Sequence, residues 1–176
     1  MTASDIALWQ TFFSVMAQVG ATLAGLLFVG LTISLQHVLA ARGYLSRAFS
    51  ALFLQLEVLL IGLFGLLPGQ PPFVVGIEFI VVSLALFTGI WTFTHNFPED
   101  ENSAVLGSRG LRAFRTSLTF GGTLFPAAGG IALVAGWRGA LYLLMPGIVA
   151  CVYQAIGYAW VFAVEIPRRV ETPKNS

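Results

Sequence analysis

Residues 6–40 read IALWQTFFSVMAQVGATLAGLLFVGLTISLQHVLA, without a single Asp, Glu, Lys or Arg. A continuous helix over this run would be roughly 50 Å long, whereas the hydrocarbon core of a bilayer is about 30 Å thick. We therefore predict a helix that crosses the membrane and either tilts or projects beyond the hydrocarbon at its ends. The run is far longer than the apolar core of a signal peptide, so we expect it to be retained.

Apolar runs recur along the rest of the chain. Charged residues make up 10% of the 176 residues, against about 25% in soluble domains, and the mean hydropathy is +0.84. We predict an all-α fold, a polytopic transmembrane helix bundle formed by one domain over residues 1–176. Its five helices are expected at about 8–38, 48–67, 73–94, 112–135 and 139–166. The cluster Pro68-Gly69-Gln70-Pro71-Pro72 predicts the turn between the second helix and the third.

The basic residues indicate how the chain is threaded. With five crossings, every Lys and Arg except Arg138 falls on one side of the membrane. The positive-inside rule then places the N-terminus outside and the C-terminus in the cytoplasm. Trp9 and Trp137 map to the outer interface, and Trp91 and Trp160 map to the inner one.

The first helix carries a stripe of polar and small residues that recur every three or four positions and therefore share one face. One interpretation is the wall of a water-lined path surrounded by several copies of the chain. The other is a packing face, on which small residues let neighbouring helices approach closely. The stripe consists of Gln10, Ser14, Gln18, Ala21, Thr22, Gly25, Thr32 and Gln36.

Glu57 lies about ten residues inside the second helix, and hence near the membrane centre. An ionised carboxylate there costs at least about 2.5 kcal/mol, so we expect Glu57 to face the protein interior and to have partners. Gln18, Tyr153 and Gln154 lie at the same predicted depth, with Cys151 nearby. The site is either a cation or proton site, which is the usual role of intramembrane acids, or a neutral acid that holds helices together.

Two further features of the membrane segments have alternative explanations. Glu78 and Arg138 are predicted at similar depth, where an ion pair is expected, although Glu78 would also suit an acidic ring at a pore mouth. The pairs Gly121-Gly122, Gly129-Gly130 and Pro146-Gly147, together with Pro126, either bend the last two helices or serve as packing positions.

No motif for catalysis or cofactor binding is present. Cys151 is the single cysteine, so a disulfide within the chain is impossible, and His37 and His95 lack further ligands at metal-binding spacing. The chain contains no phosphate-binding loop, nucleophile elbow or dinucleotide fingerprint. We expect no cofactor, no metal and no enzymatic activity. Glu57, Tyr153 and Cys151 are the residues from which an active site could be imagined, and they show no recognised spacing. The net charge of +1 gives no reason to expect a nucleic-acid partner.

The segment from Ala21 to Leu31, ATLAGLLFVGL, resembles the first helix of uncharacterised small bacterial multi-span integral membrane proteins. The resemblance is confined to this helix and implies a bacterial cytoplasmic membrane but no activity.

Our leading hypothesis is a small oligomeric channel or permeation protein, in which the first helix lines the path and Glu57 and Glu78 set a preference for cations or protons. The alternative is an accessory or regulatory protein that docks on another membrane protein through the same stripe. The expected partners are the lipid bilayer, further copies of the chain and, in the alternative, that second protein.

Overall fold

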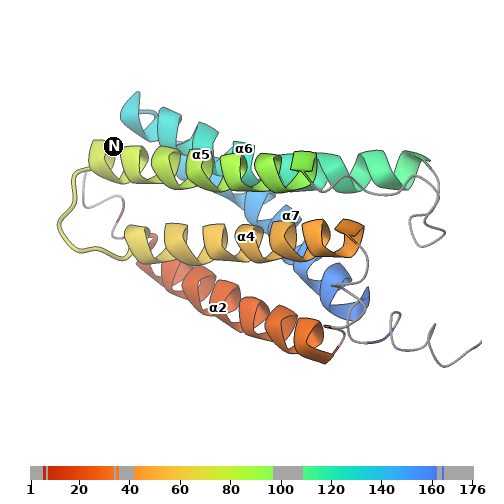
Figure 1. Cartoon of the computed structure of the whole chain (residues 1–176). Helices are drawn as coiled ribbons and strands as arrows, with labels where there is room; N and C mark the ends of the chain where they lie inside the picture. The colour runs from red at the N-terminus through yellow and green to blue at the C-terminus, as the bar shows by residue number, and fades with distance from the viewer. Residues whose placement is uncertain are drawn as a thin grey trace, which may run out of the picture.

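The computed structural model describes residue 6, residues 8–33, residue 35, residues 42–96, residues 109–161 and residue 164. Over these residues the chain forms helices and no strand. Five of the helical segments are long and apolar enough to cross a membrane, in agreement with the predicted fold class. The elements are α2 (Gln10–Ile33), α4 (Arg42–Gly65), α5 (Pro72–Asn96), α6 (Arg109–Val134), the 3₁₀ helix η2 (Ala140–Leu143) and α7 (Leu144–Trp160) (Figure 1).

The helix bounds differ from the predicted ones mainly at the starts of α4, α6 and α7, and the predicted start of the fifth helix near residue 139 is instead the 3₁₀ helix η2. α4 begins at Arg42 rather than near residue 48, and α6 begins at Arg109 rather than near residue 112. Hydropathy marks only the apolar part of a helix, whereas α4 and α6 also include the more polar residues that precede their apolar runs. The predicted helix ends at 36–38 and 165–166 lie outside the described residues.

Glycine in the left-handed conformation forms the turns that end α4 and α6. Gly69 has φ +74° within the predicted turn after α4, and Pro72 starts α5, a position where proline needs no amide partner. Gly136 has φ +76° after α6, and the Trp137 N–H donates to the Ala132 carbonyl at 2.9 Å. This bond satisfies one of the carbonyls that a helix end leaves free.

α4 is the central helix of the bundle. It contacts α2, α5, α6 and α7, and it is the most buried of the five spans. Figure 1 shows α4 between α2 and α5, with α7 crossing obliquely behind it. α7 also contacts α2, so the last span in the sequence packs beside the first.

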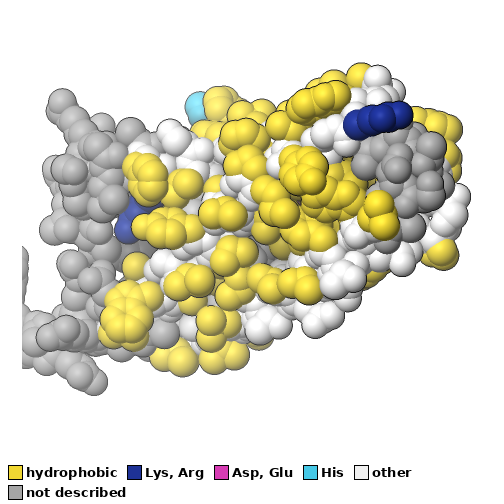
Figure 2. Space-filling view, turned by 180° about the vertical axis from the view of Figure 1, so that it is seen from behind, with side chains coloured by type: hydrophobic (Ala, Val, Ile, Leu, Met, Phe, Trp, Pro, Cys, Tyr) yellow, Lys and Arg dark blue, Asp and Glu magenta, His cyan; other side chains and the backbone are white. Residues whose placement is uncertain are grey.

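The surface between the two ends of the bundle is largely apolar. Phe28, Val81 and Val149 are each more than half exposed. On the face shown in Figure 2, hydrophobic side chains cover the middle, and the visible Lys and Arg side chains lie near the ends. An apolar surface of this extent suits hydrocarbon and would be unfavourable in water.

Glycines bring α2 and α4 into backbone contact. A Cβ atom added at Gly62 would lie 2.7 Å from the Ala17 nitrogen, and one at Gly20 would lie 2.8 Å from the Leu59 nitrogen. Because lipid does not drive apolar helices together, such close van der Waals contact is a main source of their association. The Gly25 position of the predicted stripe plays no part in it, since a Cβ there meets nothing within 4 Å.

Several glycines of the last two spans, together with Pro126, are also packing positions. α6 continues through Pro126 as one helix, and a Cβ at Gly147 of α7 would lie 2.8 Å from the Pro126 Cδ. Gly130 of α6 faces Gly76 of α5, and a Cβ on it would lie 2.6 Å from the Gly76 carbonyl oxygen. Of the two explanations considered for these residues, the structure therefore favours packing.

The glycine contact between α2 and α4 predicts that the same substitution, glycine to alanine, has different effects on stability at two positions of the bundle. Gly62→Ala should lower the free energy of unfolding by about 1–3 kcal/mol, because the new methyl group meets backbone that cannot yield easily. Gly25→Ala should instead raise it by up to about 1 kcal/mol, since alanine is the better helix former. Denaturant unfolding of the detergent-solubilised protein measures both values, and equal effects would contradict the packing described here.

Candidate intramembrane polar site

Glu57 lies on α4 with its side chain completely buried. The side chain of Ser83 on α5 interacts with this carboxyl, but the geometry of a hydrogen bond is not reached. Among the described residues, neither Glu57 oxygen has a hydrogen-bond partner, and the Ser83 hydroxyl also has none. Glu57 thus faces the interior as expected, whereas the expected partners are missing from the described part of the chain. An unpaired buried polar group costs about 1–3 kcal/mol, so Glu57 lowers the free energy of unfolding of the bundle.

Gln55 is a second buried polar residue on α4, and it is not among the predicted site residues. Its Nε2 donates to the backbone carbonyl of Cys151 on α7 at 2.9 Å, across the centre of the bundle. Its Oε1 has no hydrogen-bond partner within the described residues. The sequence did contain an indication of this role, because Gln55 interrupts an apolar run only two residues before Glu57.

Two residues predicted at the depth of Glu57 face away from it. Gln18 is exposed on α2, where its Nε2 donates to the Ser14 hydroxyl at 3.1 Å. Tyr153 of α7 is 62% exposed, and its ring packs edge-on against Phe114 with centroids 6.3 Å apart. The structure therefore does not bring Gln18 or Tyr153 together with Glu57, because equal depth leaves the direction of a side chain open.

Gln154 is buried on α7, but it connects α7 to α6 rather than to Glu57. Its Nε2 donates to the Thr119 hydroxyl at 2.9 Å, and that hydroxyl lies 3.3 Å from the Gln154 Oε1. The Thr119 hydroxyl also lies 3.0 Å from the Arg115 carbonyl of its own helix. Gln154 thus acts as an interhelical link, one of the roles considered for polar residues in such a bundle.

Glu78 does not form the expected ion pair with Arg138. Its Oε1 accepts a hydrogen bond from the Gln70 Nε2 at 2.8 Å, so the carboxylate is held by the turn that precedes its own helix. Its Oε2 is buried without a hydrogen-bond partner among the described residues, while Arg138 is exposed. The two predicted intramembrane acids therefore occupy separate environments.

The predicted stripe of α2 faces outward. Within the described part of the chain, α2 packs through another face, which includes Phe13, Ala17 and Gly20, so a packing role of the stripe would require a helix from outside this bundle. The Thr22 and Thr32 hydroxyls donate to carbonyls of their own helix at 2.7 Å. Gln10, Gln18, Ala21, Thr22, Gly25 and Thr32 are exposed, and Ser14 is half-buried.

Comparison with known proteins assigns no role to these residues. No protein-family model matches the chain, and no match was found among curated proteins or solved structures. Within the described part of the chain, no three His, Cys, Asp or Glu residues come together as a metal site would require. His37 lies outside the described residues. Among the described residues, the buried polar side chains of the bundle include Gln55, Glu57 and Ser83.

Replacement of Glu57 tests whether its carboxyl destabilises the bundle or holds the helices together. Glu57→Met keeps the approximate volume and removes two unpaired buried oxygens, so the free energy of unfolding should rise by about 1–3 kcal/mol. Glu57→Gln keeps two polar atoms at the end of the side chain and should change the free energy of unfolding by less than about 1 kcal/mol. Denaturant unfolding in detergent measures both values. A clear loss of stability in Glu57→Met would show that the acid holds the helices together.

Proposed function

We propose that this chain is an integral membrane protein that assembles with further copies of itself and forms a permeation path between them, lined by α2. The observation that carries the proposal is the exposed position of Gln18 on the least buried of the five spans. The predicted bacterial cytoplasmic membrane is its proposed location.

The amide of Gln18 is poorly suited to face lipid. Its Nε2 makes one hydrogen bond to Ser14, whereas a glutamine side chain offers two donors and an accepting oxygen. Threonine hydroxyls on the same face are satisfied by their own helix, but the remaining Gln18 groups are not. Burying such groups in hydrocarbon is costly, so a covering of water or of another polar surface is favoured.

The residues around Gln18 suit contact between copies. Ala21 and Gly25 are small and exposed, and small residues at this spacing let helices from different chains approach closely. A ring of α2 helices would then present Ser14, Gln18 and Thr22 to a common axis. This arrangement supplies the polar lining that a single tightly packed chain of this size does not.

Glu57 has a different role in this proposal from the one that the sequence suggested. α2 contacts α4 near Gln55, Leu59 and Gly62, whereas Glu57 interacts with Ser83 of α5. Glu57 would therefore lie behind the lining helix and influence the path indirectly. Gain or loss of a proton by an unpaired buried carboxyl changes how α4 packs against α5, and this change makes the path sensitive to protons.

A second candidate is an accessory protein that docks on another membrane protein through the α2 stripe. Phe28 and Val29, which are 63% and 55% exposed, separate Gly25 from Thr32 and would interrupt a polar lining. A stripe that alternates in this way also suits a helix of a different protein. Crosslinking separates the two candidates.

Cysteine crosslinking tests self-association. Cys151 is buried, so Gln18→Cys introduces the accessible thiol, and Leu84→Cys, at an exposed position of α5, serves as the matched control. In native membranes, oxidation should yield a covalent dimer of Gln18→Cys and little dimer of Leu84→Cys. A disulfide requires Cα atoms within about 7 Å, so it reports direct contact between two α2 helices. Equal dimer yields would contradict the α2 interface.

Flux through protein-containing liposomes tests the path itself. The wild-type protein should pass protons or small cations, and Gln18→Leu should slow passage about tenfold, since a barrier higher by about 1.4 kcal/mol has that effect. Glu57→Gln should still conduct but lose the dependence of flux on pH. Absence of flux in the wild-type protein under every pH and voltage would contradict the proposal, and co-purification of a stoichiometric second protein would support the accessory role.

A further inference from the structure

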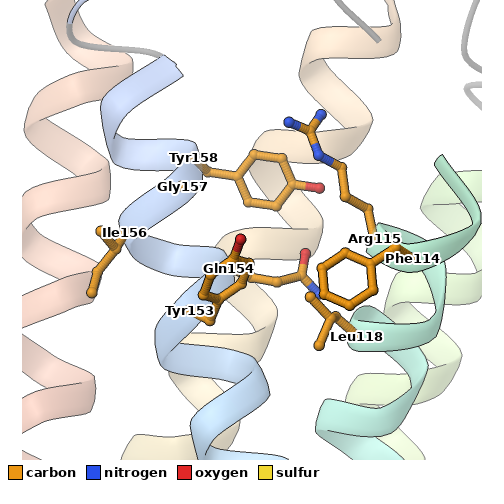
Figure 3. A pocket seen from close by; sticks show the side chains of 8 residues that line it. All are labelled: Phe114, Arg115, Leu118, Tyr153, Gln154, Ile156, Gly157 and Tyr158. Atoms are coloured by element: carbon orange, nitrogen blue, oxygen red, sulfur yellow. The ribbon is translucent and has the colours of Figure 1, made fainter. Parts of the chain in front are cut away.

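A groove of about 240 Å³ opens on the surface between α6 and α7. Its lining includes Phe114, Arg115, Leu118, Tyr153, Gln154 and Tyr158, which combine one guanidinium with aromatic and aliphatic walls (Figure 3). Figure 3 shows Arg115 and Tyr158 reaching over the groove from α6 and α7, with Gln154 below them.

The groove lies at the depth of the headgroups. The apolar span of α6 begins at Phe114, and the apolar span of α7 ends at Trp160. Trp160 and Trp91 are both more than half exposed near this end of the bundle, and exposed tryptophans mark the interface between hydrocarbon and water. A ligand in the groove would therefore have its polar part beside Arg115 and its apolar part beside Leu118 and Tyr153.

The charge of Arg115 is not balanced by the described residues. Its carbonyl lies 3.0 Å from the Thr119 hydroxyl, but its guanidinium has no ion pair or hydrogen bond within the described part of the chain. A guanidinium presents several donors in a planar fork, an arrangement that matches a phosphate group. The nearby Thr119–Gln154 hydrogen bond holds the two walls of the groove together.

We propose that the α6–α7 groove binds the headgroup phosphate of an anionic phospholipid, with Arg115 as the residue that contacts the phosphate. Charge complementarity selects the phosphate, and the apolar walls below Arg115 accommodate the start of an acyl chain. Basic pockets between membrane helices are recognised sites for acidic headgroups. This site lies apart from Glu57 and from the α2 stripe, and it does not depend on the proposed permeation path.

Gly157 allows the groove to be blocked without disturbing the fold. It lines the groove, and a Cβ added there meets nothing within 4 Å. Gly157→Leu should therefore fold and fill the space that the lipid would occupy, while leaving Arg115 in place. Arg138→Gln is the charge-matched control, because Arg138 is an exposed arginine away from the groove, after the other end of α6.

Native mass spectrometry of the full chain in detergent, with added phosphatidylglycerol or phosphatidylcholine, tests the proposal. The wild-type protein and Arg138→Gln should retain one phosphatidylglycerol at least about fivefold more tightly than phosphatidylcholine. Arg115→Gln and Gly157→Leu should both lose this preference. Thermal unfolding of each variant establishes that it is folded.

Three outcomes would overturn the proposal. The first is equal retention of the two lipids by the wild-type protein, and the second is retention by Gly157→Leu at the wild-type level, which would place the lipid outside the groove. The third is displacement of phosphatidylglycerol by millimolar inorganic phosphate, which would identify a site for the free anion instead. The proposal is supported if Arg115→Gln and Gly157→Leu both lose the preference for phosphatidylglycerol and inorganic phosphate has no effect.

Discussion

Hydrocarbon offers no hydrogen-bond partner to a peptide group, and the rest of this structure depends on that constraint. The described spans satisfy their backbone within helices, and the turns at Gly69 and Gly136 lie between successive spans. Exposed threonines follow the same rule, as Thr88 donates its hydroxyl to the Leu84 carbonyl at 2.7 Å. Longer polar side chains are satisfied only in part by their own helix, as the single bond from Gln18 to Ser14 shows. Gln18, Gln55 and Glu57 are therefore the polar side chains whose surroundings the helices themselves do not supply in full.

The same constraint explains how much of the fold the sequence predicts. The number and approximate positions of the spans follow from apolar runs, and the turn around Gly69 follows from its Pro and Gly residues. The extension of α4 back to Arg42 was not predicted, because hydropathy locates the hydrocarbon and not the end of a helix. The orientation of the bundle relative to the cytoplasm stays a prediction from the basic residues.

The direction in which each helix faces was harder to predict than its position. In water, the apolar face of a helix turns inward, but in lipid both faces are apolar and only close packing distinguishes them. The α2 stripe was therefore open to two interpretations, and the contact of Gly20 with Leu59 shows that another face packs inward. The buried position of Glu57 followed from its charge. Its lack of partners and the hydrogen bond from Gln55 to Cys151 could not be predicted, because both depend on how three helices are rotated relative to one another.

The hydrogen bond from Gln55 to Cys151 has a consequence for biogenesis. Domains and segments emerge from the ribosome in chain order, so α4 enters the bilayer before α7 has been made. During that interval the Gln55 amide lacks the carbonyl that it later binds, so it depends on another hydrogen-bond partner until α7 is in place. A nascent chain interrupted before α7 would keep this amide without its final partner.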